Sequence, residues 1–251
     1  GETVASISER GTERELLELV ARAGMRLRDK LGAGELSATA AGGVRASLPS
    51  SLEAARLYSE GLAKLRTFDA LAARGLLEQA VAADPKFALA HSALSAAWAN
   101  LGYDAKAEEE AKKAFELAAN LSREDRLAVE GRYRETSNDW GKAIEIYRTL
   151  CNLFPDNLDY GLRLVRAQTY GGKGKDALVT LQALRKLPPP AGDDPRIDLA
   201  EAPAARSLGD SKQAAAAAAR AASKAQERGA PLFVARARYE EGSGLQNVGE
   251  L

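Results

Sequence analysis

A set of small and large apolar residues returns at a fixed interval along most of this chain, with polar stretches between its members. The set begins with a glycine, continues with an alanine, a large residue and a further apolar residue, and closes with a proline. Its two clearest copies are Gly61, Ala73, Leu77, Ala80 and Pro85, and then Gly131, Ala143, Tyr147, Leu150 and Pro155. Each position advances by 70 residues (131 − 61 = 70), which is two periods of about 35 residues, a length typical of a repeated helix pair. The pattern predicts a tandem array of paired helices.

Further copies fill the interval and extend the array toward the C-terminus. Their residues at the matching positions are Ala107, Ala114 and Ala119, then Ala177, Leu181 and Pro189, and then Ala214, Ala218 and Ala221. Gly102 stands at an inner turn, Gly209 comes before Ala214, and Gly242 and Gly249 fit the first helix and inner turn of the last copy. The last copy reaches only its first helix before Leu251. We therefore expect five complete helix pairs after Ser51 and half of a sixth.

Residue size explains why these positions recur. The glycine and the first alanine are small, so the two antiparallel helices of a pair can approach closely, and the larger residue at the position of Leu77 fills the space beside them. Proline at Pro85 and Pro155 disfavours helix in the residue before it, which ends the second helix. Ser122 and Asn157 are expected to cap the first helices that follow them.

The repeat resembles the tetratricopeptide repeat family over roughly residues 52–251. This resemblance implies an all-α fold, a right-handed superhelix of helix-turn-helix units, whose curvature leaves a concave groove. The chain departs from the family pattern at the fourth and eighth positions of the first helix, where the family has Trp and Gly. Leu57, His91, Leu127 and Gly161 stand at the fourth position, and Ser95, Val165 and Ala202 at the eighth. These departures loosen individual repeats without breaking the period.

The first fifty residues do not follow the repeat. Residues 3–8 are expected to form a short strand, and Thr12 with Glu15 forms a capping box before a helix that ends at Gly32. We interpret residues 1–50 as the C-terminal remnant of an upstream α/β domain with a linker, and residues 51–251 as the repeat array. The apolar face of the expected helix is Leu16, Val20, Ala23, Leu27 and Leu31.

A second resemblance lies at the junction. Residues 11–32, 45–49 and 53–61 resemble the C-terminal region of bacterial multidomain signalling proteins, where a Ser/Thr kinase or a winged-helix DNA-binding domain precedes a membrane span and tetratricopeptide repeats. The resemblance implies a sensory or docking region of a membrane-anchored regulator. It favours an extracytoplasmic location and leaves a cytoplasmic one open. The given residues contain no kinase motif.

Composition argues against several classes of function. Lys plus Arg and Asp plus Glu number 35 each, so zero net charge gives no reason to expect nucleic acid or an anionic membrane as a partner. No stretch approaches the roughly 20 apolar residues of a membrane span. His91 is the only histidine and Cys151 the only cysteine, and both are expected to pack in the core. We therefore expect no catalytic residues, no metal, no cofactor and no enzyme activity.

The function must then come from the surface. In the tetratricopeptide family the first helix of each repeat lines the groove. The corresponding positions here are Tyr58, Arg66, Asn100, Arg132, Arg166, Tyr170, Arg206, Arg236 and Tyr239. Arg132, Arg166 and Arg206 are expected to form an exposed basic row. Tyr and Arg are favoured anchors at protein interfaces, although Arg is also a good exposed helix former.

These residues predict an interaction module that binds a protein or peptide segment of an unidentified partner. The alternative is a sensor region that binds a small anionic ligand and regulates an upstream kinase or DNA-binding domain. The sequence leaves the oligomeric state open.

Overall fold

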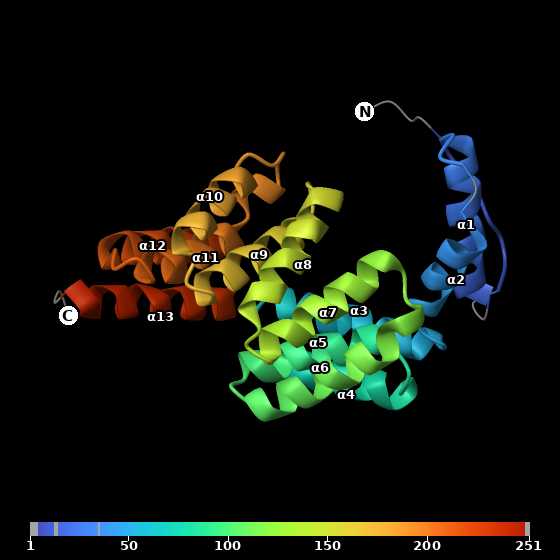
Figure 1. Ribbon diagram of the computed structural model, residues 1–251, viewed down its shortest axis with the longest axis horizontal. Helices are drawn as coiled ribbons and strands as arrows, with labels where there is room; N and C mark the ends of the chain where they lie inside the picture. Colours follow the sequence, from blue (N-terminus) through green and yellow to red (C-terminus); the bar gives the residue numbers. More distant parts are fainter. Residues whose placement is uncertain (1–4, 13–14, 35, 249–251) are drawn as a thin grey trace. The chain divides into compact units, whose positions relative to one another are not determined.

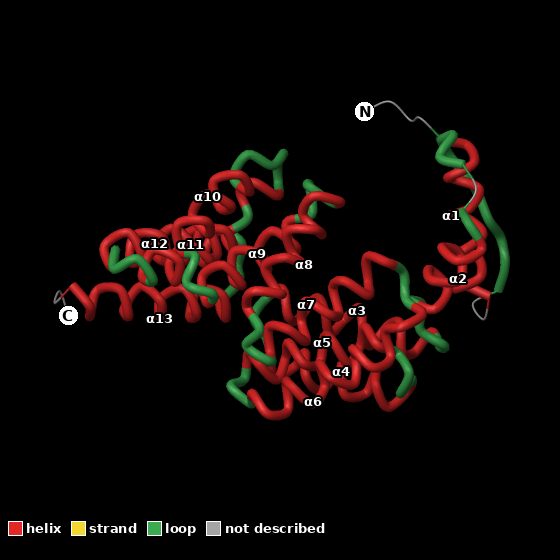
Figure 2. Tube along the Cα trace, in the orientation of Figure 1, coloured by secondary structure: helices red, strands yellow, loops and turns green. Residues whose placement is uncertain are grey.

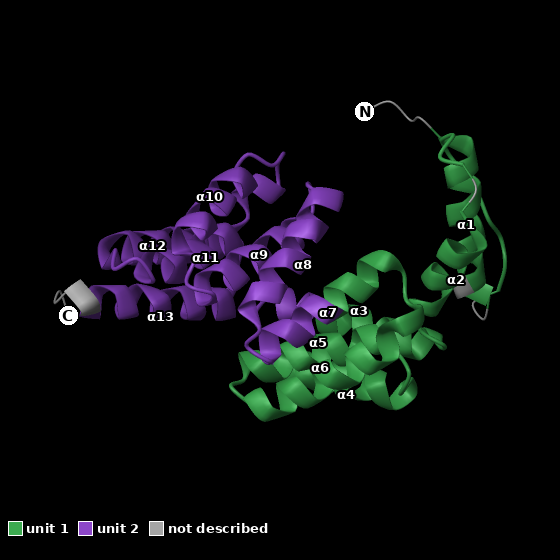
Figure 3. Cartoon of the chain, viewed as in Figure 1, with its two compact units in different colours: residues 1–62, 71–129 green, residues 63–70, 130–251 purple. Residues whose placement is uncertain are grey.

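The computed structural model describes residues 5–12, 15–34 and 36–248. The chain divides into two compact units, which we call unit 1 (residues 1–62 and 71–129) and unit 2 (residues 63–70 and 130–251) (Figure 3). All regular secondary structure in the described residues is helical (Figure 2). The all-α class expected from the repeat is confirmed.

Unit 1 begins with two helices that precede the repeat and continues with most of the first two helix pairs. Its helices are α1 (Leu16–Lys30), α2 (Ala38–Ala46), α3 (Leu52–Arg66), α4 (Ala70–Ala83), α5 (Ala88–Asn100) and α6 (Asp104–Leu117), then a 3-10 helix (Ala118–Asn120) and the first half of α7 (Arg123–Thr136) (Figure 1). The last turn of α3 and the turn that follows it belong to unit 2.

Unit 2 continues the alternation of first and second helices. It contains the end of α7, then α8 (Trp140–Leu153), α9 (Leu158–Tyr170), α10 (Gly174–Leu184), a 3-10 helix (Ala191–Asp193), α11 (Pro195–Arg206), α12 (Ser211–Glu227) and α13 (Pro231–Val248). The five expected helix pairs are therefore present as α3–α4, α5–α6, α7–α8, α9–α10 and α11–α12. Helix α13 stands where the sequence predicts the first helix of a sixth pair.

The paired helices approach at the predicted small residues. A Cβ atom placed on Gly61 would lie 2.6 Å from Leu77 Cγ, and one placed on Gly131 would lie 2.7 Å from the ring of Tyr147. Leu77 and Tyr147 are fully buried, as are these alanines of the set: Ala73, Ala80, Ala114, Ala143, Ala177, Ala214, Ala218 and Ala221. Ala119, which stands at the proline position, is exposed. The register of the repeat is confirmed in both units.

Side-chain caps begin the first helices of the third and fourth pairs, as expected. The Ser122 hydroxyl accepts a hydrogen bond from the Asp125 N–H at 3.1 Å. The Asn157 side chain accepts one from the Tyr160 N–H at 3.2 Å. Each cap satisfies a donor that the helix itself leaves unpaired, so the loops before α7 and α9 are fixed at their helix ends.

The inner turn of each pair contains one residue with positive φ. Three of these residues are glycines and the others are Asn138 and Phe68, the latter with φ of 62°. A left-handed conformation costs a bulky residue roughly 1–2 kcal/mol. The Phe68 ring packs edge-on against the buried Phe233 ring, 4.7 Å between centroids within unit 2, and such aromatic pairs contribute about 0.5–1.5 kcal/mol. This contact offsets much of the backbone strain.

The N-terminal segment matches the expectation for its helix but not for its strand. Glu15 accepts hydrogen bonds from the Thr12 N–H (2.8 Å) and hydroxyl (3.0 Å) before α1, and Gly32 follows its end with φ of 67°. Residues 5–8 have no strand, and residues 3 and 4 lie outside the described part of the chain. The expected strand is wrong for residues 5–8, because the described chain offers no second strand to pair with their backbone. Instead, Lys30 Nζ donates to the Ser6 carbonyl at 2.7 Å.

Helix α2 was not expected, and it fixes residues 36–50 to the repeat within unit 1. The Ser122 N–H donates to the Ser47 hydroxyl at 3.2 Å, and the Ser50 N–H donates to the Asp84 carboxylate at 2.7 Å. A Cβ on Gly43 would lie 3.1 Å from Ser122 Cα. Since Gly43 lets α2 approach the backbone before α7, residues 36–50 belong to the packed structure of unit 1.

Candidate partner-binding surface

The nine residues predicted to line the groove fall in both units. Tyr58 and Asn100 belong to unit 1, and the other seven belong to unit 2. Asn100 is exposed at the end of α5, whereas the Tyr58 ring packs against Phe87 with 4.9 Å between centroids. Tyr58 therefore serves core packing in unit 1 as well as facing solvent. The remaining residues are on or beside the first helices of unit 2.

Arg66, at the end of α3, is exposed and makes an ion pair with Asp159 at 3.5 Å. Asp159, at the start of α9, also receives a hydrogen bond from Arg196 of α11 at 2.6 Å. Burial raises the pKa of Asp159, but Arg196 and Arg66 outweigh this and keep the pKa below its usual value. The carboxylate is therefore charged at neutral pH and holds two arginines from other first helices.

Arg206 and Arg236 share one buried carboxylate. Arg206 Nη1 donates to Glu240 Oε2 at 2.9 Å, and Arg236 Nη2 donates to Glu240 Oε1 at 2.9 Å. Glu240 lies on α13 and is buried, so this pairing joins α11 to α13. Arg206 is thus engaged inside unit 2, and its side chain is only partly exposed.

Arg132, Arg163 and Arg166 surround a second buried carboxylate, Glu135. Arg132 Nη1 donates to Glu135 Oε2 at 3.2 Å. The Arg163 and Arg166 guanidinium groups on α9 each lie 4.0 Å from Glu135 oxygens. We call these four residues the arginine cluster. It joins α7 to α9 and lies beside Tyr147 of α8, over whose ring Arg163 is placed at 6.0 Å from the centroid.

The pKa values in the cluster follow from burial and from the surplus of cations. Burial would raise the pKa of Glu135, but the three guanidinium groups, Arg132 first, lower it below its usual value. Burial, and then repulsion by Arg163, lowers the pKa of Arg132 to about 10. Burial, and then the Glu135 charge, raises the pKa of Tyr147. At neutral pH the cluster therefore contains three cations and one anion.

Two tyrosines project from this surface, each with an arginine against its ring. Tyr170 on α9 is 55% exposed and Tyr239 on α13 is 69% exposed. The Arg166 guanidinium lies 5.2 Å from the Tyr170 ring centroid, and the Arg236 guanidinium lies 5.7 Å from that of Tyr239. Tyr170 is also stacked on Trp140, with 5.4 Å between centroids.

The expected exposed basic row needs revision at two of its three members. Only Arg166 is well exposed, because Arg132 is covered and bound to Glu135 and Arg206 is bound to Glu240. The prediction named the arginines but missed their carboxylate partners and Arg163. The sequence did offer a signal for the two carboxylate partners. Glu135 near the end of α7 and Glu240 in α13 each lie close in sequence to an arginine of the same helix.

The single histidine is buried as expected, whereas the single cysteine, which was expected in the core, is only partly buried. His91 is buried, with Nδ1 2.6 Å from Glu110 and Nε2 3.1 Å from the Pro85 carbonyl oxygen. Cys151 is only partly buried, and burial raises the pKa of its thiol to about 11. The described residues contain no group of three or more His, Cys, Asp or Glu side chains that could hold a metal ion.

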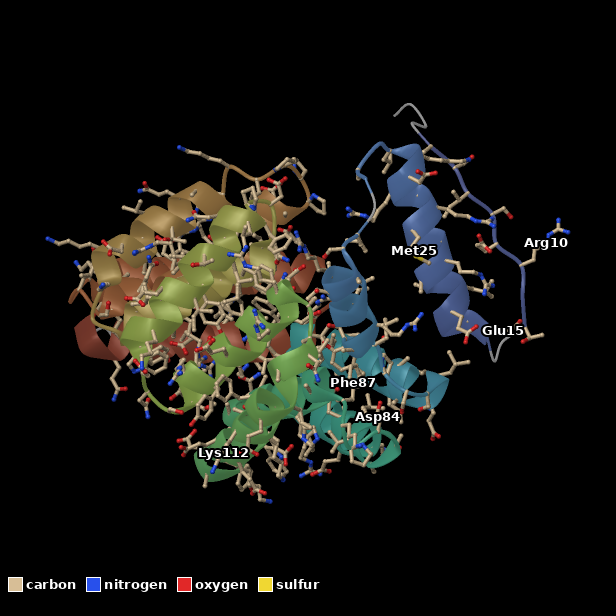
Figure 4. All side chains as sticks on the ribbon, turned by 45° about the vertical axis from the view of Figure 1, so that its right-hand side comes forward. Arg10, Glu15, Met25, Asp84, Phe87 and Lys112 are labelled. Carbon is tan, nitrogen blue, oxygen red and sulfur yellow. The ribbon has the colours of Figure 1, made fainter. Side chains whose placement is uncertain are left out.

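Unit 1 contains a cleft of about 860 Å³ between α1, the segment after α2 and the loop before α5. Met25 of α1 lines one side, and Asp84 and Phe87 line the other (Figure 4). Met25 belongs to a series of exposed apolar side chains that includes Leu16, Val20 and Leu27 of α1 and Leu31 just after its end. The lining charges are mixed in sign, with Arg22 and Lys86 beside Glu18 and Asp84.

Comparison with known proteins identifies the architecture. The tetratricopeptide repeat protein TTC0263 from Thermus thermophilus is similar at 19% identity, over 77% of this chain and 99% of its own, with a TM-score of 0.50. The fold is that of a tetratricopeptide repeat array. A tetratricopeptide repeat protein from Parabacteroides merdae is 13% identical over 90% of this chain and 86% of its own, with a TM-score of 0.49.

No family model matches the sequence, and no curated protein matches it at a significant level. Among the described residues, no helix combines the length and the apolarity needed to cross a membrane.

Proposed function

We propose that this chain is a non-enzymatic module for protein–protein interaction, which binds a segment of a partner on the first-helix surface of its repeats. The observation that supports this most directly is the pair of exposed tyrosines, Tyr170 and Tyr239, each packed under an arginine. Tyr and Arg are the residue types most often found as anchors of binding energy at interfaces. Both pairs are on first helices of unit 2.

These side chains are also held in place before any partner arrives. Tyr170 is fixed by contacts with both the Trp140 ring and the Arg166 guanidinium. Arg236 is fixed by Glu240, which is buried. Because ordering a long side chain on binding costs roughly 0.5–1.5 kcal/mol, anchors that are already ordered bind a partner more tightly than free ones.

Selection from a random peptide library on the full chain tests this proposal. Peptides recovered on the parent should bind a Tyr170→Ser, Tyr239→Ser double variant at least about tenfold more weakly, a change of about 1.4 kcal/mol. Tyr103→Ser is the matched control, because Tyr103 is 54% exposed but lies at the turn before α6 in unit 1. Equal affinity of the selected peptides for the parent and the double variant would contradict the proposal.

We further propose that the module belongs to a bacterial signalling protein and acts outside the cytoplasm. The support is the resemblance of residues 11–32, 45–49 and 53–61 to the C-terminal region of bacterial multidomain signalling proteins, which are anchored in a membrane. The sequence encoded upstream of Gly1 tests this, because a kinase or DNA-binding domain followed by a membrane span is expected there. An upstream region of another kind would overturn the proposed context and leave the binding proposal intact.

The alternative function, a sensor for a small anionic ligand, draws support from a different observation. The arginine cluster has more positive than negative charge at a partly covered site.

A further inference from the structure

We propose that the arginine cluster of Arg132, Arg163, Arg166 and Glu135 is a binding site for a phosphoryl dianion, either free or as a phosphate monoester on a partner. This proposal deepens the proposed function, since the cluster is part of the same first-helix surface. It rests on that function only where the phosphate is taken to belong to a protein partner.

The charges of the site favour a further anion. Three guanidinium groups face one carboxylate, which leaves a surplus of two positive charges. Asp159 also attracts Arg163, but its direct partners are Arg196 at 2.6 Å and Arg66 at 3.5 Å. A phosphate monoester carries a charge between about −1.5 and −2 near neutral pH. A dianion therefore balances the surplus, and a single carboxylate does not.

The side chains are layered in a way that favours a ligand from solvent. The exposed fraction of the side chain rises from 4% for Glu135 through 12% for Arg132 and 32% for Arg163 to 49% for Arg166. The carboxylate thus lies beneath with Arg132, and Arg163 and Arg166 are the members most exposed to solvent. An incoming anion would meet the cations first and be separated from Glu135 by them.

The cluster also has unused hydrogen-bonding groups. Two donors, Arg132 Nε and Arg163 Nη1, are buried without a hydrogen bond, and so are one acceptor, Glu135 Oε1, and the Tyr147 hydroxyl. Buried donors are paired in most proteins, and each one that is not costs about 1–3 kcal/mol. Arginine donates two parallel hydrogen bonds to phosphate oxygens, and a phosphoryl group from solvent would use the exposed parts of Arg163 and Arg166, whose side chains are 32% and 49% exposed.

Isothermal titration of the full chain at low ionic strength tests the site with defined probes. These are inorganic phosphate, acetate, and a phosphoserine peptide beside its serine counterpart. Phosphate is expected to bind the parent, and Arg166→Gln is expected to weaken it at least about tenfold. The matched control is Arg148→Gln, which removes the same charge from an exposed position of α8 and should leave the affinity within about twofold.

A second variant, Arg163→Lys, keeps the charge but loses the planar pair of donors, and it should also weaken phosphate binding. Circular dichroism establishes that each variant is folded before it is titrated. Tighter binding of the phosphoserine peptide than of free phosphate would identify a partner as the source, and the reverse would identify a free ligand.

The inference is overturned if phosphate fails to bind the parent, if Arg166→Gln and Arg148→Gln lose the same affinity, or if acetate binds as tightly as phosphate. None of these results depends on the library peptides that test the interaction proposal. Loss of phosphate binding with retained peptide binding would therefore reject the site alone.

Discussion

Glu240 accepts a hydrogen bond at 2.9 Å from Arg206, a residue that precedes it by 34 positions and lies on the previous first helix. The carboxylate is buried, while the guanidinium is partly exposed. The pair therefore holds α11 to α13 and, at the same time, occupies a position predicted to contact a partner. This double role changes what substitution of Arg206 should do.

Arg206→Ala should lower the free energy of unfolding by about 1–3 kcal/mol, because the buried Glu240 loses one of its two arginine partners. An exposed arginine with no such partner would give a change within about 0.5 kcal/mol. Urea denaturation of this variant beside Arg148→Ala, in which an exposed arginine is removed, measures the difference. Indistinguishable midpoints would mean that the pair does not contribute to folding.

Ala143→Leu should destabilise the protein by about 1–3 kcal/mol through overpacking, since Ala143 is fully buried at the approach of α7 and α8. Ala105→Leu is the control, because Ala105 is exposed on α6 and its replacement should be nearly neutral. The comparison is made by urea melts of the two variants. A loss at position 105 as large as that at 143 would show that the repeat register does not determine the cost.

Glycine replacement should have opposite signs at two helical sites. Gly131→Ala should destabilise by about 1–3 kcal/mol, because the added methyl would lie 2.7 Å from the Tyr147 ring, which is fully buried and cannot move aside. Gly75→Ala should stabilise by about 0.5–1 kcal/mol, since a Cβ there meets nothing within 4 Å. Thermal melts of the two variants decide this, and the same sign at both sites would be inconsistent with the packing described.

The Glu135 carboxylate should make stability fall in acid. Its pKa is lower in the folded protein than the value of about 4.3 expected when unfolded. Its contribution is therefore fully present above about pH 4.3 and is lost as the pH falls through the lowered folded value. Glu135→Gln removes that contribution, so the difference in unfolding free energy between parent and variant should shrink below about pH 4.3.

The measurement is a set of urea titrations at about pH 7, 4.5 and 3, which bracket the unfolded pKa, with Glu145→Gln as the control for an exposed glutamate of α8. The control should differ from the parent by little at any of these pH values. A difference between Glu135→Gln and the parent that stays constant over the whole range would contradict the role assigned to the charge.

The fold could be predicted because close contact between paired helices requires residues of particular size at fixed positions, and these recur in the sequence. Gly61 and Leu77 recur as Gly131 and Tyr147, and the structure brings each pair together. The same reasoning fails in the first fifty residues, where no period exists. Helix α2 was missed for that reason, because its packing on Ser122 depends on a contact across 75 residues between Ser47 and Ser122.

The candidate site could be predicted only in part. Helical position within a repeat indicates which side chains lie on the first helix, and it identified Arg132 and Arg166. Helical position does not predict which carboxylate packs against these arginines, because Glu135 and Arg163 come together only when two repeats pack. Ion pairs between repeats depend on how two helices pack, which the pattern of residues along one helix does not specify.

Two side-chain hydrogen bonds within the described part of the chain join residues that are 34 positions apart, the Ser50 N–H with Asp84 and Arg206 with Glu240. Each therefore spans one full structural period, within unit 1 and within unit 2 respectively. If a complete repeat were inserted between two such partners, each partner could still find a suitable residue 34 positions away, provided that the inserted repeat carried it. An insertion of only a few residues would always move the two partners out of contact. Evolutionary changes in the length of this chain should therefore occur in whole repeats.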